Sequence, residues 1–233
     1  LLEIKDVDIR LEPLEQARTA IDRGIHAGGA FSALVPLVPL YYSGLMRIDV
    51  ENPTSINQDY FILSKGHAVA PLAAIYADLG FFDRSILAGS RSVNSILNGH
   101  PGPLLPGVHT ATGPMGQGIC VAGGLAVAGQ MNDRFDVFAI TGDGELQEGT
   151  VWEAVMYAAT QRSDNFCVIV DNNRGQLDNP TALHLNMTGI ADQFRAFGWR
   201  VFEVEGTRYA PTYDALCRFK HEPRDGRPTA IIS

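Results

Sequence analysis

In the second half of the chain, short apolar runs alternate with segments in which apolar residues recur at helical spacing. This alternation predicts an α/β fold. Residues 136–140 and 166–170 are apolar runs with the length and composition of buried strands. Between them, residues 146–161 repeat apolar side chains at helical spacing, so that Val151 and Val155 share one face. A strand, a helix and a second strand in this order form a βαβ unit, whose two strands lie parallel.

The remaining elements extend this pattern. Further strands are predicted at 59–63, 200–204 and 229–232, and further helices at 11–25, 31–45, 69–79, 119–131, 187–197 and 213–221. Pro36 and Pro39 are expected to bend or interrupt the second of these helices. We therefore predict one domain over 1–233, built as a doubly wound, mainly parallel sheet flanked by helices, with a helical lead-in over about 1–58.

Two turns of unusual composition follow the strands of the βαβ unit. Gly142, Asp143 and Gly144 follow the first strand, and the pair of Asn172 and Asn173 follows the second strand about thirty residues later. Open α/β sheets bind ligands at the carboxyl ends of their strands, where both turns lie. Glycines allow the backbone to approach a ligand and leave amide groups free to meet a phosphate. A tight turn without a ligand is the alternative interpretation of the Gly-Asp-Gly triplet alone.

Asp143 and Asn173 together suggest a site for a hard cation. A carboxylate and a neutral amide oxygen suit Mg2+, which takes its remaining ligands from diphosphate and water. Zinc is a poor match, because no cluster of Cys and His residues stands nearby. The pairing therefore favours a metal ion that bridges the protein to a diphosphate.

Two other segments carry polar groups next to glycines. His26 lies between two predicted helices, where a capping or core histidine is the alternative to a functional one. Ser64, Lys65 and His67 follow the predicted strand at 59–63 and precede a helix. These three residues are either the start of a capped helix with a solvated lysine, or hydrogen-bond donors that face an anion.

Composition and charge narrow the class of protein. With 233 residues, of which 45% are hydrophobic and 19% charged, the chain is long enough for one sizeable core. The net charge of −8 and the lack of a Lys/Arg cluster argue against a nucleic-acid partner. Cys120, Cys167 and Cys217 are scattered and form no CxxC pair, as expected in a reducing compartment. No signal peptide is visible, and the most apolar stretch, 33–46, is too short to span a bilayer, so we expect a cytoplasmic protein without a membrane partner.

Five stretches, taken in order, resemble the N-terminal, diphosphate-binding domain of the transketolase family. They are His-Ala-Gly-Gly at 26–29, Phe-Ile-Leu-Ser-Lys-Gly-His-Ala at 61–68, Gly-His-Pro at 99–101, Thr-Gly-Pro-Met-Gly-Gln-Gly at 112–118, and the Gly-Asp-Gly turn with its Asn-Asn pair. The last feature is shared by the wider group of thiamine diphosphate (ThDP) enzymes, whereas the motifs at 61–68, 99–101 and 112–118 are specific to the transketolase branch. The resemblance covers nearly the whole chain and implies that ThDP is the cofactor.

The resemblance assigns a metal site to the two special turns. It implies that Asp143, the Asn173 side chain and the Gly175 carbonyl hold Mg2+, for which Ca2+ or Mn2+ can substitute. It also places Gly144 against the diphosphate of the cofactor.

The resemblance places the cofactor ring and the substrate beside three histidines. His26, His67 and His100 would line the substrate and thiazolium side, where imidazoles hydrogen-bond ketose hydroxyls and exchange protons. His67 would also reach the diphosphate. Gly113 and Met115 would present their backbone and side chain to the cofactor ring.

Two glutamates near the metal-binding turn are grouped with the cofactor-binding residues. Glu148 matches a family glutamate that lies at the dimer interface and links the two active sites. The resemblance gives Glu145 no specific role. A solvated carboxylate in the first turn of a helix is the simplest interpretation of that side chain.

The resemblance further implies a two-chain enzyme. Transketolases ordinarily carry three domains, and this chain covers only the first, so it resembles the first subunit of a split-gene transketolase. ThDP chemistry requires a carboxylate that tunes the aminopyrimidine, and in the family this group comes from the pyrimidine-binding domain. We therefore expect the partner to be a C-terminal transketolase subunit, in an α2β2 heterotetramer that transfers a two-carbon ketol unit from a ketose phosphate to an aldose. The chain alone is expected to be inactive.

One departure from the family leaves the sugar substrates open. Where the family has Gly-His-Asp, with a histidine that touches diphosphate and substrate, this chain has Gly206, Thr207 and Arg208. Thr207 cannot transfer protons near neutral pH, although Arg208 can contact a phosphate. Gly102 and His109 also differ from the residues common in the family. The alternatives are transfer of the two-carbon unit to a carrier thiol, acyloin formation, or a non-catalytic partner protein that keeps the fold.

Overall fold

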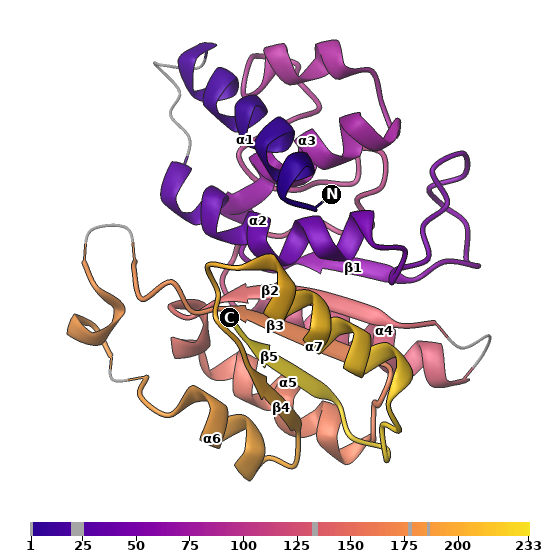
Figure 1. The fold of residues 1–233 in the computed structure, drawn as a ribbon, viewed down its shortest axis with the longest axis vertical. Coiled ribbons are helices and arrows are strands. Elements are labelled where there is room, and N and C mark those ends of the chain that lie inside the picture. Colours follow the sequence, from indigo (N-terminus) through magenta and orange to yellow (C-terminus); the bar gives the residue numbers. More distant parts are fainter. Residues whose placement is uncertain (1, 20–25, 132–134, 177–178, 186) are drawn as a thin grey trace.

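The computed structural model describes residues 2–19, 26–131, 135–176, 179–185 and 187–233. Five parallel strands form one sheet in the order β1-β2-β3-β5-β4 (Figure 1). The strands are β1 (Tyr60–Leu63), β2 (Val137–Gly142), β3 (Phe166–Asp171), β4 (Arg200–Glu203) and β5 (Thr229–Ile232). All five strands lie where the sequence predicts them, because a parallel sheet buries both of its faces and so requires short apolar runs.

Seven α-helices surround the sheet in the described part of the chain. They are α1 (Leu2–Thr19), α2 (Ala27–Tyr42), α3 (Val69–Leu79), α4 (Gln117–Met131), α5 (Gly149–Thr160), α6 (Ile190–Ala196) and α7 (Tyr209–His221). Short 3-10 helices at Gly66–Ala68, Arg84–Gly89, Glu145–Gln147 and Thr181–Leu183 lie in the connections. Among the described residues, no helix combines the length and apolarity needed to cross a membrane.

The alternating side chains of each strand divide the core between the two faces of the sheet. Phe138 and Ile140 of β2 belong to a buried cluster that includes residues of α2 and α7. Val137 and Ala139 of the same strand belong to a second cluster, which includes residues of α4, α5 and α6. Because neighbouring residues of a strand point to opposite faces, helices cover both sides of the sheet. This arrangement confirms the predicted doubly wound α/β fold.

The helical lead-in forms an additional layer beyond α2. α1 packs against both α2 and α3, and Figure 1 shows these helices stacked above the sheet. The helix predicted at 11–25 begins earlier, at Leu2, and residues 20–25 lie outside the described residues. α2 runs through Pro36 and Pro39 without interruption, and both prolines are buried in its packing.

Some boundaries differ from the prediction because turns replace the ends of helices. The helix predicted at 146–161 is divided into the 3-10 turn Glu145–Gln147 and α5, since Glu148 has an extended backbone between them. α6 begins at Ile190, later than predicted, because Gly189 adopts a left-handed conformation directly before it. The first of these differences changes how the side chains next to the Gly-Asp-Gly turn are directed.

Candidate functional site

The carboxyl ends of β1, β2 and β3 lie side by side at one edge of the sheet. In the strand registers, Leu63 of β1 pairs with Ile140 of β2, and Gly142 of β2 pairs with Asp171 of β3. The turns that follow these three strands therefore meet at this edge. Each turn carries polar residues that the sequence analysis singled out.

The Gly-Asp-Gly turn and the Asn-Asn turn are in contact. The Asp143 amide donates to the Asp171 carbonyl at 3.2 Å, which extends the pairing of β2 and β3 beyond the strands. The α-carbon of Gly144 lies against Gln176, where an added methyl group would come within 2.6 Å of the Gln176 Nε2. Glycine therefore leaves the room that this close approach needs. The structure thus brings together the two turns that the sequence analysis paired.

Asp143 is a buried carboxylate, with only 3% of its surface exposed. Its Oδ1 accepts a hydrogen bond from the Gly144 amide at 2.9 Å, and its Oδ2 accepts one from the Thr181 hydroxyl at 2.8 Å. Both donors are neutral, so within the described residues the negative charge has no cation next to it. Burying a carboxylate without a cation is costly, and a bound cation would offset that cost.

Asn173 lies in a tight turn beside the segment that carries Asp143. Its Oδ1 accepts a hydrogen bond from the Gly175 amide at 3.0 Å, and its Nδ2 donates to the Ser32 hydroxyl at 3.2 Å. Arg174 has a positive φ of 60°, which turns the chain sharply between these two residues. In the part of the chain that the structure describes, no three His, Cys, Asp or Glu side chains gather as a metal site. A cation here would therefore also depend on amide and carbonyl oxygens.

A buried ion pair connects the turns to the body of the protein. Lys65, in the turn after β1, pairs with Asp171 at the end of β3, and their side chains are 2% and 7% exposed. Ser32 of α2 donates to the same carboxylate at 2.6 Å and accepts the hydrogen bond from Asn173. The sequence-based alternative of a solvated lysine is therefore wrong, because the ammonium group lies inside the protein.

The three predicted histidines gather at one place. The rings of His26 and His67 are in edge contact, with centres 5.4 Å apart. Gly29 lies against the His67 ring, since an added methyl group on this glycine would come within 2.6 Å of the His67 Nε2. His100 lies against Gly66, where a methyl group would approach its Cδ2 to 3.0 Å. The histidines come from the start of α2, from the turn after β1 and from the loop before α4.

The surroundings of His67 favour its neutral form. Burial lowers the pKa of His67 to about 4, and the positive charges of Lys65, His26 and His100 act in the same direction. Burial also lowers the pKa of His100, to which Arg91 and His26 contribute. At neutral pH, His67 is therefore an uncharged imidazole with one nitrogen that donates and one that accepts a hydrogen bond.

The glycine-rich loop before α4 is fastened to the end of β1. The Thr112 hydroxyl donates to the Leu63 carbonyl at 2.7 Å. Gly113 lies beside the histidines, because a methyl group there would come within 3.3 Å of the His100 Cδ2. Met115 is 58% exposed, so the loop presents this side chain to solvent or to a ligand.

Glu145 is not the solvated carboxylate that the sequence analysis expected. It is 4% exposed, because the 3-10 turn that begins the segment after Gly144 directs the side chain inward. Four neutral groups donate hydrogen bonds to it: the hydroxyls of Ser64 and Thr141 and the amides of Gly116 and Gly142. These donors replace the water that a surface carboxylate would bind.

Three other residues named from the sequence, Glu148, Thr207 and Arg208, are not members of the histidine group. Glu148 is half-buried beside the glycine-rich loop, where a methyl group on Gly116 would come within 3.2 Å of its Cβ. Thr207 follows β4, the edge strand that β5 separates from β3, and its exposed hydroxyl donates to Glu205 at 3.1 Å. Arg208 pairs with the same glutamate at 3.6 Å. Both bonds stay within the loop after β4 and do not involve His26, His67 or His100.

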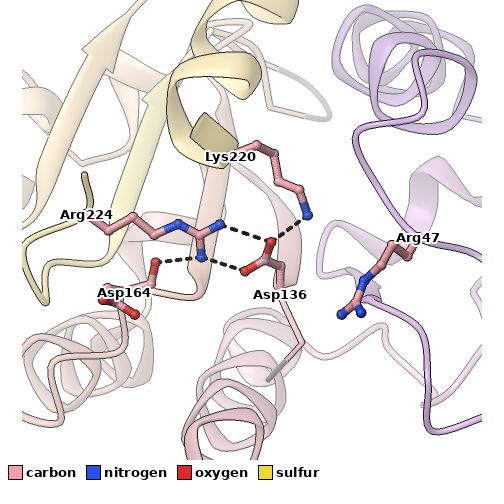
Figure 2. A pocket seen from close by; sticks show the side chains of 5 residues that line it. All are labelled: Arg47, Asp136, Asp164, Lys220 and Arg224. Carbon is pink, nitrogen blue, oxygen red and sulfur yellow. Dashed lines mark hydrogen bonds and ion pairs between the residues drawn. The ribbon is translucent and has the colours of Figure 1, made fainter. Parts of the chain in front are cut away.

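A hollow of about 400 Å³ opens at the opposite edge of the sheet, where the strands begin (Figure 2). It is lined by Arg47, Asp136, Asp164, Lys220 and Arg224. Figure 2 shows Lys220 and Arg224 directed at Asp136. Each of them forms an ion pair with this carboxylate at 2.6 Å. Because Asp136 directly precedes β2, this network joins α7 to the start of the sheet and lies away from the histidines.

Several residues that complete the site were missed from the sequence. They are Ser32, Asp171, Gln176 and Thr181. Asp171 carried a signal, because it stands between the strand predicted at 166–170 and the Asn-Asn pair. Ser32 and Thr181 carried none, since their bonds to Asp171 and Asp143 join residues 139 and 38 positions apart.

Comparison with known proteins identifies one family. Residues 17–232 match the family described as "Transketolase, thiamine diphosphate binding domain". Human transketolase is 36% identical over 236 residues, which cover 100% of this chain and 37% of that protein. Among solved structures, the transketolase of Leishmania mexicana superposes with a TM-score of 0.90 at 28% identity, covering 100% of this chain and 36% of that one. The chain therefore spans little more than a third of these relatives.

Two relatives that are named as subunits match in a larger share of their length. One is from the apulose-4-phosphate transketolase of Phocaeicola vulgatus and is 35% identical over 182 residues, covering 78% of this chain and 64% of that protein. The other is the 6-deoxy-6-sulfo-D-fructose transketolase subunit SqwG of a Clostridium species, which is 35% identical over 217 residues, covering 89% of this chain and 75% of that protein.

Proposed function

Because the chain belongs to the family of transketolase thiamine diphosphate-binding domains, we propose that it is the diphosphate-binding subunit of a ThDP- and Mg2+-dependent transketolase. The reaction moves a two-carbon ketol unit from a ketose phosphate to an aldose. The observation that carries this proposal is the meeting of the Gly-Asp-Gly and Asn-Asn turns at the edge where the three histidines gather.

The donor set at this edge fits Mg2+ and a diphosphate. Asp143 supplies a buried carboxylate without a neighbouring cation among the described residues, and Asn173 and Gly175 supply neutral oxygens. A hard cation accepts such oxygens and completes its shell with phosphate and water. Asp143, Asn173 and the Gly175 carbonyl would therefore hold Mg2+, and Gly144 would lie against the diphosphate.

ThDP, when bound, supplies a thiazolium ylid that stabilises a carbanion. The histidines of this chain provide the hydrogen-bonding groups around the reacting carbons. His67 is neutral at pH 7, since burial lowers its pKa to about 4, so one of its ring nitrogens can accept a hydrogen bond from a substrate hydroxyl. His26 contacts His67, and His100 lies against both Gly66 and Gly113 of the glycine-rich loop. The three imidazoles would orient the sugar hydroxyls and share the proton transfers.

A second polypeptide would complete the site. We propose a C-terminal transketolase subunit that carries the pyrimidine-binding domain and its carboxylate, in an α2β2 assembly with two copies of this chain. The relatives that are named as transketolase subunits support a two-chain enzyme. Glu148, half-buried beside the glycine-rich loop, would lie at the interface that links the two active sites.

The relatives also suggest the class of sugar. Both of these relatives are named for sugars with an anionic group, a phosphate in one and a sulfo group in the other. We therefore propose an anionic sugar as the substrate of this enzyme.

Reconstitution of the chain with its partner subunit tests the proposal. The pair is assayed for ketol transfer with xylulose 5-phosphate as donor and ribose 5-phosphate as acceptor, and with sugars that carry other anionic groups. Activity should require both chains, ThDP and Mg2+, and should disappear when EDTA removes the metal. Full activity of the isolated chain, or the absence of ThDP binding by the pair, would contradict the proposal.

The metal assignment has its own variant. Asp143→Asn keeps the shape of the side chain and removes its charge, so Mg2+-dependent ThDP binding should weaken by about a hundredfold, the factor for a strong charged contact. Asp192→Asn is the matched control, because Asp192 is an exposed carboxylate on α6, and it should bind as the wild type does. Equal affinities of the two variants would remove Asp143 from the metal site.

A further inference from the structure

We propose that Glu145 is a positioning residue, which fixes three segments of the site relative to one another through a single buried carboxylate. This inference rests on the function proposed above. The Ser64 hydroxyl and the Gly116 amide, at 2.9 Å, donate to Oε1. The Thr141 hydroxyl, at 2.7 Å, and the Gly142 amide, at 3.3 Å, donate to Oε2.

The four donors belong to the three segments that carry the site. Ser64 directly precedes Lys65 in the turn that leads to His67. Gly116 lies in the glycine-rich loop that also carries Gly113 and Met115. Thr141 and Gly142 end β2 and directly precede Asp143. The carboxylate of Glu145 therefore sets the distances between three segments: the turn that leads to His67 (the histidine turn, 64–67), the glycine-rich loop, and the Gly-Asp-Gly turn.

A carboxylate is suited to this place, and its amide counterpart is not. An ionised carboxylate only accepts hydrogen bonds and has about four acceptor positions, and here four donors fill them. A glutamine would turn an NH2 group toward two of these donors. The Ser64 and Thr141 hydroxyls can rotate to accept a hydrogen bond, but the amides of Gly116 and Gly142 cannot.

The packing around Glu145 leaves no space for a substitute. A methyl group on Gly118 would come within 2.5 Å of the Ser64 Oγ, so the first turn of α4 lies directly against this donor. A methyl group on Gly116 would come within 2.4 Å of the Thr150 Oγ1, and Gly116 has a positive φ of 82°. Water cannot readily take over the four bonds in so tight a place, because it needs both volume and partners. Loss of the carboxylate should therefore loosen all three segments.

Two variants and a matched control test the inference. Glu145→Gln should weaken Mg2+-ThDP binding by the chain with its partner subunit by about ten- to a hundredfold, the factor for one hydrogen bond to a charged group. Thr141→Val removes one donor and keeps the shape of the side chain. It should also weaken Mg2+-ThDP binding, but by a smaller factor than Glu145→Gln. Thr229→Val is the control: both threonines are 0% exposed in parallel strands, but Thr229 begins β5 at the opposite edge.

The coupling of the variants separates positioning from general stability. Thr141→Val should weaken ThDP binding less in the Glu145→Gln background than in the wild type, because the two residues share one hydrogen bond. If folded Glu145→Gln binds ThDP as tightly as the wild type, the inference is wrong. If Glu145→Gln fails to fold, Thr141→Val decides, and binding equal to that of Thr229→Val overturns the inference.

A measurement without cofactor keeps this test apart from the proposed function. In the unliganded chain, the Gly116 and Gly142 amides should exchange hydrogen more slowly in the wild type than in Glu145→Gln, because their acceptor is intact. Failure of the wild type to bind ThDP would defeat the proposed function alone. Unchanged exchange at both amides would defeat the positioning role.

Discussion

The ammonium group of Lys65 and the carboxylate of Asp171 form a buried ion pair across the end of β2. Lys65 follows β1 and Asp171 ends β3, and β2 lies between these two strands in the sheet. Ser32 adds a hydrogen bond to the same carboxylate and connects it to Asn173. One ion pair therefore ties the histidine turn to the turn that is proposed to hold the metal.

Removal of Lys65 should destabilise the fold strongly. Lys65→Met leaves Asp171 buried without a cation, so the free energy of unfolding should fall by about 3–5 kcal/mol in urea denaturation. The double variant Lys65→Met/Asp171→Leu should lose less than Lys65→Met alone, because it leaves no unpaired charge. A double variant that is less stable than the single one would contradict this account. Arg18→Met is the control, since the pair of Arg18 and Glu15 is exposed, and its unfolding midpoint should not change.

The neutral state of His67 should make stability depend on pH. The pKa of its imidazole is lowered from 6.5 to about 4 in the folded protein, chiefly by burial and next by the charge of Lys65. Between these two values the unfolded chain binds the proton and the folded chain does not, so the free energy of unfolding falls as pH is lowered from about 6.5 toward 4. His67→Gln should lose less stability than the wild type between pH 7 and about pH 5. An NMR titration of His67 with a midpoint above pH 6 would refute the prediction.

Two adjacent glycines of α2 should respond differently to the same substitution. An added methyl group on Gly29 would come within 2.6 Å of the His67 Nε2, whereas one on Gly28 meets nothing within 4 Å. Gly29→Ala should displace the His67 ring and lower kcat/KM of the reconstituted enzyme by about tenfold or more. Gly28→Ala should raise the free energy of unfolding by about 0.5–1 kcal/mol, the gain of alanine over glycine in a helix, with a far smaller effect on activity. Equal losses of activity in both variants would show that the His67 contact is unimportant.

The ion pairs at the edge of the sheet where the strands begin should contribute to stability without affecting the histidine site. Lys220 bonds Asp59 and Asp136, and in its absence Arg47 and Arg224 still pair with these carboxylates. Lys220→Met should therefore lower the free energy of unfolding by only about 1–3 kcal/mol, because no carboxylate is left unpaired. The affinity of the folded variant for ThDP should equal that of the wild type, as measured by titration calorimetry. A weaker affinity would show that this edge is coupled to the histidine turn.

Local patterns along the chain were enough to predict the class of fold and the location of the strands. Apolar runs such as 166–170 become strands because a parallel sheet is buried on both faces, and this requirement is local and visible in the pattern. The same logic placed the turns of Asp143 and Asn173 at one edge, since parallel strands end together. The helix boundaries near Glu148 and Gly189 were less predictable, because single backbone conformations there end or delay a helix.

The pairing of the polar groups in the site became visible only in the folded chain. The bonds of Glu145 to Ser64 and of Lys65 to Asp171 join residues that are 81 and 106 positions apart. No periodicity in the sequence records such contacts, because they depend on which strands become neighbours and on the direction of each side chain in the packed core. The local sequence therefore predicts a surface carboxylate at Glu145, whereas in the fold it is buried among four donors.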